Sequence, residues 1–86
     1  MRKDQIRSEG DALIYLTDCT LATVEHLASK KSSSKSELKR QIAMAEHAIS
    51  CIDQFGLDHK NTRVDEVKAD GGMQAWVAKI KEKHIK

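Results

Sequence analysis

The sequence has few large apolar side chains and no long hydrophobic run. Leucine, isoleucine, valine and phenylalanine together supply 18 of its 86 residues. A fraction this low is typical of disordered chains when the net charge is also high. The net charge is only +2, so we expect a folded chain with a thin hydrophobic core. A thin core is often completed by a partner, commonly a second copy of the chain, and we therefore expect a homodimer.

Cysteine is also scarce, and the N-terminus carries no secretory signal pattern. Cys19 and Cys51 are too few to form a disulfide framework. We therefore expect reduced thiols and a cytoplasmic protein. The most apolar window, residues 12–28, includes Asp18 and Glu25 and is periodic rather than continuous, which argues against a membrane partner. The length predicts one domain, residues 1–86.

Patterns typical of enzymes and of metal sites are absent as well. No segment alternates as a strand does, so no glycine-rich phosphate loop follows a strand. His47 and Cys51 lie four residues apart, and Asp53 or Glu46 could assist such a pair on a helix. Cys19 should lie at the same level, but His47 points away from the apolar stripe, so the three converge poorly. A chain this small offers little concavity for a substrate. We predict no enzymatic activity, no cofactor and no metal.

Apolar residues recur with helical period in two segments, about residues 4–29 and 35–55. The first stripe spans roughly 160°, which is wider than one partner helix covers. Acidic residues lie opposite it, among them Asp11, Asp18 and Glu25. The stripe contains Ile6, Leu13, Ile14, Leu16, Thr20, Leu21, Val24, Leu27 and Ala28. The second stripe contains Leu38, Ile42, Ala45, Ile49 and Ile52.

The second segment has signals at both ends. Ser34 and Glu37 have the spacing of a capping box, in which each side chain bonds the other residue's backbone N–H. Gly56 fits the C′ position of a Schellman motif, with Leu57 after it packing on Ile52. The Lys/Ser stretch between the two segments is short, so we predict an antiparallel helical hairpin.

We expect a second apolar flank beside these stripes. Its members are mostly small side chains, with two aromatic rings near one end, and they should point to one side of the hairpin. They are Ala12, Tyr15, Cys19, Met44, Ala48, Cys51 and Phe55. A surface of this kind should be covered.

The C-terminal segment is the expected cover. Thr62 can cap a short helix over residues 63–69, and Asp70-Gly71-Gly72 interrupts the pattern. A helix over about 72–84 follows, and Trp76 should dock it on the hairpin. Alternatively, the glycine hinge lets this helix exchange between two copies. The predicted fold is therefore all-α and resembles a three-helix bundle.

Positive charge is concentrated in two segments. Residues 30–40 carry a net charge of +4 and residues 71–86 a net charge of +3, whereas residues 1–29 and 41–70 are acidic. Clustered lysine and arginine are typical of phosphate contacts. A nucleic-acid-binding regulator is the alternative function, and its candidate residues are Lys30, Lys31, Lys35, Lys39, Arg40, Lys79, Lys81 and Lys83.

The preferred function is a protein-interaction module, which needs a surface rather than a catalytic group. We expect it to act stoichiometrically as a regulator, adaptor or inhibitor. Its small size and lack of enzyme patterns are typical of proteins encoded by phages and mobile elements, including inhibitors of host defence systems. The candidate contact residues are Tyr15, Cys19, Met44, Phe55 and Trp76.

Overall fold

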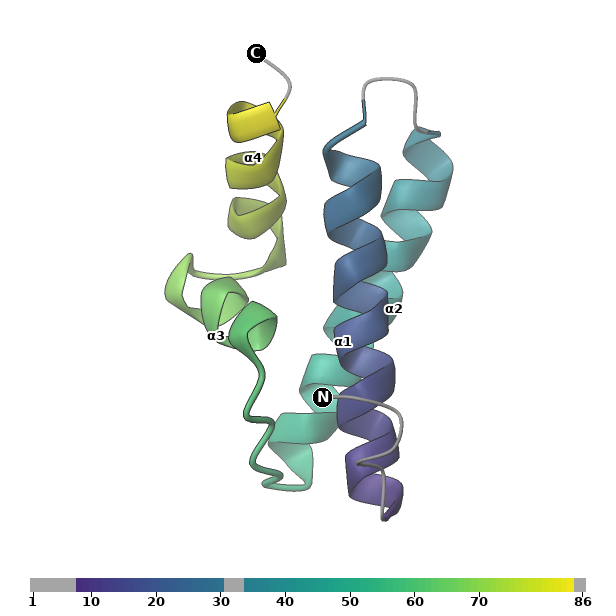
Figure 1. The fold of residues 1–86 in the computed structure, drawn as a ribbon, viewed down its shortest axis with the longest axis vertical. Coiled ribbons are helices and arrows are strands. Elements are labelled where there is room, and N and C mark those ends of the chain that lie inside the picture. Colours follow the sequence, from purple (N-terminus) through teal and green to yellow (C-terminus); the bar gives the residue numbers. More distant parts are fainter. Residues whose placement is uncertain (1–7, 31–33, 85–86) are drawn as a thin grey trace.

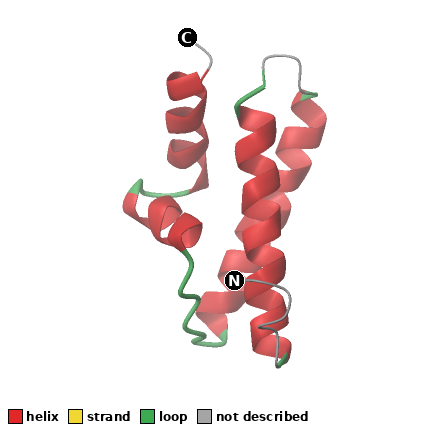
Figure 2. Cartoon of the chain, in the orientation of Figure 1, coloured by secondary structure: helices red, strands yellow, loops and turns green. Residues whose placement is uncertain are grey.

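A computed structural model describes residues 8–30 and 34–84 and confirms the all-α fold. Four helices follow one another: α1 (Glu9–Ala28), α2 (Lys35–Gln54), α3 (Thr62–Ala69) and α4 (Met73–His84). Short loops join them, and the described ranges contain no strand (Figure 2). Within these ranges no helix combines the length and the apolarity that a membrane span requires.

Helix α1 begins with a serine cap. Ser8 has an extended backbone (φ −153°), and its hydroxyl accepts a hydrogen bond from the Asp11 N–H at 3.1 Å. This satisfies one of the N–H groups that a helix start leaves unpaired. The described helix begins at Glu9, and the predicted start at Asp4 lies outside the described residues. The predicted stripe residue Ile6 lies outside the described residues.

Helix α2 ends as predicted. Gly56 takes a positive φ of 64°, which glycine adopts without the steric cost that a Cβ would add. The Gly56 N–H then bonds the Asp53 carbonyl at 3.2 Å, and the Leu57 N–H bonds the Ile52 carbonyl at 3.1 Å. These are the two hydrogen bonds of a Schellman motif.

The start of α2 matches only half of the predicted capping box. The Ser34 hydroxyl accepts from the Glu37 N–H at 3.4 Å. The Glu37 carboxylate does not reach back, because it accepts from Arg40 Nη2 at 2.7 Å and from Gln41 Nε2 at 3.2 Å. These hydrogen bonds lower the pKa of Glu37 and raise the pKa of Arg40.

The C-terminal helices lie along one side of the hairpin. Helices α1 and α2 are antiparallel neighbours, and α4 runs beside them in the direction of α1 (Figure 1). Helix α3 lies on the same side of the hairpin as α4, below its N-terminal end in this view. The C-terminal end of α4 and the connection between α1 and α2 lie at the same end of the molecule (Figure 1). Asn61, and not the predicted Thr62, caps α3, since its side-chain oxygen accepts from the Val64 N–H at 3.1 Å.

The core uses a narrower face of α1 than the predicted stripe. The buried residues of α1 follow one another at alternating steps of three and four, as in a helix–helix seam. They are Ile14, Thr17, Leu21, Val24 and Ala28. Leu16, a predicted stripe residue, is 60% exposed. Thr17 takes part in its place, because its hydroxyl donates to the Leu13 carbonyl at 2.7 Å and so satisfies its donor within the helix.

Candidate functional site

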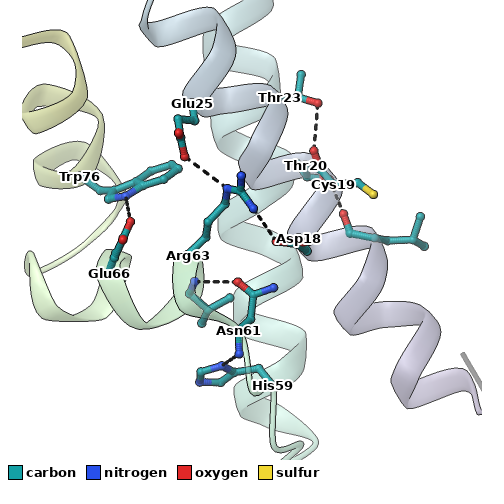
Figure 3. A network of polar contacts seen from close by, with 12 residues as sticks. Asp18, Cys19, Thr20, Thr23, Glu25, His59, Asn61, Arg63, Glu66 and Trp76 are labelled. Atoms are coloured by element: carbon teal, nitrogen blue, oxygen red, sulfur yellow. Dashed lines mark hydrogen bonds and ion pairs between the residues drawn. The ribbon is translucent and has the colours of Figure 1, made fainter. Parts of the chain in front are cut away.

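An ion-pair cluster fixes α3 on α1. Arg63 Nη1 lies 3.0 Å from Asp18 Oδ1, and Arg63 Nε lies 3.2 Å from Glu25 Oε2 (Figure 3). Partial burial disfavours the charged guanidinium, but the hydrogen bonds that it donates to Asp18 and Glu25 outweigh this effect and raise the pKa of Arg63. Sequence reasoning missed this cluster. The sequence feature that could have indicated the cluster is the seven-residue spacing of Asp18 and Glu25, which places both carboxylates on one side of α1.

Replacing Arg63 by lysine should weaken this attachment. A lysine ammonium is a single point charge and cannot reproduce the guanidinium fork that reaches both carboxylates. We expect the free energy of unfolding to fall by about 1 kcal/mol, a value reduced for the partial exposure of the cluster. Urea denaturation followed by circular dichroism measures it. The matched control is Arg40→Lys, whose single exposed ion pair to Glu37 should change stability by less than about 0.5 kcal/mol. Equal effects of the two substitutions would contradict a positioning role for Arg63.

Trp76 docks α4 on the hairpin, as predicted. Its side chain is only 2% exposed, and its indole N–H donates to Glu66 Oε2 on α3 at 3.4 Å (Figure 3). An open cleft of about 430 Å³ lies beside it, between α1, α3 and α4. Cationic and anionic side chains both line this cleft: Glu25, Arg63, Glu66, Lys79, Lys83 and His84.

The C-terminal helices do not cover the flank that sequence analysis assigned to them. They lie along the other side of the hairpin, where Arg63 pairs with Asp18 and Glu25 on α1 and Lys68 pairs with Asp53 on α2 at 2.7 Å. Phe55 therefore stays 69% exposed and Met44 50% exposed. The expected cover is wrong because the apolar residues of α3 and α4 pack into the core on the opposite flank, where ion pairs that helical periodicity does not report also form.

The flank left uncovered is apolar. At 100° per residue, Leu16 lies roughly 180° around α1 from Glu25, and Met44 lies roughly 180° around α2 from Asp53. Since Glu25 and Asp53 face α3, Leu16 and Met44 point to the opposite side of the hairpin. We call this surface the open face. It consists of Leu13, Leu16, Thr20, Met44, Ala48, Cys51 and Phe55.

The threonines on this side of α1 add little polarity to it. Thr20 donates its hydroxyl to the Leu16 carbonyl at 2.8 Å, and Thr23 donates to the Cys19 carbonyl at 3.0 Å. Both side chains lie on the side of α1 away from Arg63 and Trp76 (Figure 3). Because each hydroxyl proton is already used within the helix, Thr20 contributes its methyl group to the open face.

The structure places Tyr15 and Cys19 beside the open face rather than on it. Cys19 is exposed and lies roughly 180° around α1 from the buried Ala28. Tyr15 is partly buried and hydrogen-bonded to Cys19, and this contact raises the pKa of the Tyr15 hydroxyl. Leu13 and Leu16 take the positions on α1 that had been expected for Tyr15 and Cys19.

The cysteine–histidine pair on α2 forms but stands alone. Cys51 Sγ lies 3.7 Å from His47 Nε2 at the surface. Asp53 does not orient this pair, because its carboxylate accepts from Lys68. In the described part of the chain, no three side chains of the histidine, cysteine, aspartate or glutamate type are grouped to hold a metal ion. The pair therefore lacks the third group that orients the base in nucleophilic sites.

The two basic segments meet at one end of the molecule. Lys35 and Lys39 of α2 and Lys81 of α4 line one open cleft of about 470 Å³. We call this surface the basic end. The other predicted residues are distributed around it: Lys30 is exposed, Arg40 pairs with Glu37, Lys79 lies 3.5 Å from Asp70, and Lys83 lines the cleft beside Trp76. Lys31 lies outside the described residues.

Comparison of the chain with protein-family models, with curated proteins and with solved structures found no match. The open face and the basic end are therefore the features that bear on function.

Proposed function

We propose that this protein is a non-enzymatic protein-binding module that acts through the open face. One observation carries the proposal. Among the described residues, the three large apolar side chains that are most exposed, Leu16, Met44 and Phe55, all lie on this one face. Scattered exposed apolar residues are ordinary, whereas a contiguous apolar surface marks an interaction site.

The shape and chemistry of the open face favour a helical partner. Two antiparallel helices form a shallow channel between them, and an amphipathic helix can lay its apolar stripe along such a channel. Met44 suits this role because its unbranched thioether adapts to different partners. Ala48 and Cys51 are small, which allows close approach of a partner backbone.

Such a module would act stoichiometrically, as a regulator, adaptor or inhibitor of the protein that it binds. We place it in the cytoplasm, where its free thiols Cys19 and Cys51 would stay reduced. Its size fits the small helical regulators and inhibitors that phages and mobile elements encode, including those directed at host defence complexes.

The test compares two variants of the tagged full chain in extracts of its native host. The open-face variant carries Leu16→Ser and Met44→Ser, and the control variant carries Lys39→Ala at the basic end. A protein retained by the wild type and by the control but lost by the open-face variant supports the proposal once its direct binding is measured with purified components. Because Leu16 and Met44 are half exposed or more, both variants should keep the helical content of the wild type. Retention of that protein by the open-face variant would contradict the proposal.

A second candidate function is nucleic-acid binding at the basic end. The observation that favours it is the convergence of Lys35, Lys39 and Lys81 from two segments that are far apart in the sequence. Cationic side chains around one cleft can neutralise neighbouring phosphates and release their counterions.

This second function predicts a steep dependence on salt. Each of Lys35→Glu and Lys39→Glu should weaken binding to every sequence tested and lower the slope of log affinity against log salt by about 1. Fluorescence anisotropy with labelled duplex DNA and RNA measures both quantities, and Lys60→Glu, remote from the basic end, is the control. Absence of binding at low salt would exclude this function.

A further inference from the structure

A groove runs along α2 on the side of the hairpin that α3 and α4 cover. Helix α4 packs mainly on α1 and α3, which leaves space between α4 and α2. Two open clefts occupy this space: the cleft of the basic end, of about 470 Å³, and a cleft of about 380 Å³ that reaches Asp53 and Lys68. Glu46 lines both clefts, so the two adjoin. We call them together the α2 groove.

The residues of α2 that line this groove form one stripe along the helix. They follow one another at steps of three and four, which keeps them on one side of α2. They are Lys35, Leu38, Lys39, Ile42, Glu46, Ile49 and Asp53. The first and the last are 18 positions apart, which corresponds to about 27 Å along the helix axis. The α2 groove is therefore long enough for about five turns of a second helix.

The three lysines of the groove are not neutralised within the described ranges. Three other described lysines each lie within ion-pair distance of an aspartate. In the part of the chain that the structure describes, none of Lys35, Lys39 and Lys81 pairs with a carboxylate. Two of these lysines come from α2 and one from α4, so positive charge faces the cleft from both sides. Like charges gathered around one cleft favour an anionic ligand.

The remaining lining residues favour a peptide over a nucleic acid. Leu38, Ile42 and Val77 belong to the core and line the cleft between the lysines, so the floor of the groove is apolar. Among the described residues that line the groove, none is aromatic, and no ring is available for base stacking. Glu46 lies about midway along the groove, where its carboxylate would repel a phosphate backbone but can pair with a cationic side chain.

We propose that the α2 groove binds an acidic amphipathic helix of a partner protein. The apolar stripe of that helix lies on the floor of the groove, and carboxylates at one of its ends pair with Lys35, Lys39 and Lys81. A lysine or arginine about two turns further along meets Glu46. The groove is a second binding site, because it lies on the opposite side of α2 from Met44 and the open face.

The charge requirement is tested by fluorescence anisotropy with two labelled helical peptides of about 18 residues, matched to the length of the groove. Both peptides carry leucine at every third or fourth position. The acidic peptide has glutamate at the polar positions of one end, and the neutral peptide has glutamine there. The full chain should bind the acidic peptide about tenfold more tightly at low salt, and the difference should shrink as salt is added. Equal affinities would overturn the proposal.

Two pairs of matched variants locate the binding site. Lys81→Gln should weaken binding of the acidic peptide about two- to fivefold, whereas Lys83→Gln, on the same helix but in the cleft beside Trp76, should not change it. Ala43→Glu adds a carboxylate at an exposed lining residue of the groove and should weaken binding about tenfold or more. Ala48→Glu, on the open face, should leave it unchanged. Circular dichroism checks that all four variants keep their helical content, and equal effects within either pair would overturn the proposal.

A labelled oligothymidylate is the third probe, and it separates the peptide from a nucleic acid. Oligothymidylate that binds more tightly than the acidic peptide and displaces it would overturn the inference, whereas failure to displace the peptide supports it. The proposed function is tested separately, because it depends on Leu16 and Met44 of the open face. Loss of a host partner in the Leu16→Ser, Met44→Ser variant would still support that function if the groove bound no peptide.

Discussion

Replacement of Trp76 by alanine is expected to lower the free energy of unfolding by about 3–5 kcal/mol. The indole is 2% exposed and lies in the core with Met73, Val77 and Ile80 of the same helix. Its removal deletes the largest buried side chain of the protein and leaves a cavity that short helices cannot fill. Small domains have total stabilities of about 5–15 kcal/mol, so this single change should release α4. Urea denaturation followed by circular dichroism measures the loss.

The control for this substitution is Trp76→Phe. Phenylalanine, like alanine, cannot donate to Glu66, but it keeps an aromatic ring in the core and leaves a smaller cavity. The loss in the free energy of unfolding should therefore be about 1–2 kcal/mol smaller for phenylalanine than for alanine. Hydrogen exchange of the alanine variant should show early loss of protection in α4 and later loss in α1 and α2. An alanine variant within about 1 kcal/mol of the wild type would contradict the packing of Trp76 described above.

The parts of the fold that sequence analysis predicted well are those with local signals. Helix α2 has a serine cap, a clear apolar stripe and a glycine stop, and its buried residues Leu38, Ile42, Ala45 and Ile52 are those of the predicted stripe. The break at Gly71 and Gly72 and the docking of Trp76 were also predicted. In each case the residues that decide the structure lie within a few positions of one another, so periodicity and capping chemistry are enough.

The parts that sequence analysis missed depend on contacts between distant residues. Arg63 and Asp18 are 45 positions apart, and no local pattern pairs them. Their ion pair lies on the flank that α3 and α4 cover, where Val64, Val67, Trp76 and Val77 enter the core, and the other flank stays open. Sequence analysis also missed the rotation of α1 that turns Thr17 rather than Leu16 into the core. Hydropathy alone favours burial of a leucine over burial of a threonine. An internal hydrogen bond and two neighbouring helices reverse this preference.

The rotation of α1 also connects the core with the proposed interface. If Leu16 had entered the core, the open face would lose the central member of its apolar stripe on α1. The ion pairs of Arg63 hold α3 against the Asp18 and Glu25 side of α1, and this arrangement leaves Leu16 exposed on the opposite side. The ion pairs and the apolar packing of α3 and α4 thus lie on one side of the hairpin, and the exposed apolar surface lies on the other.

Two leucines of α1 test this rotation directly. Leu21 is fully buried and Leu16 is 60% exposed. At concentrations low enough to keep the chain monomeric, Leu21→Ala should lower the free energy of unfolding by about 2–5 kcal/mol, whereas Leu16→Ala should lower it by less than about 1 kcal/mol. The two substitutions remove the same atoms from the same helix, so each serves as the control for the other. Denaturant titration gives both values.

Repeating the denaturant titration at high protein concentration further separates the role of Leu21 in the core from the role of Leu16 on the open face. If the open face binds a second copy, dimer formation adds stability to the wild type by mass action, and Leu16→Ala loses part of that gain. The difference in the free energy of unfolding between Leu16→Ala and the wild type should therefore grow with protein concentration. The loss that Leu21→Ala causes in the monomer should remain the same. Equal losses for both leucines in the monomer would place Leu16 in the core, as hydropathy alone predicts, and would remove the open face as described here.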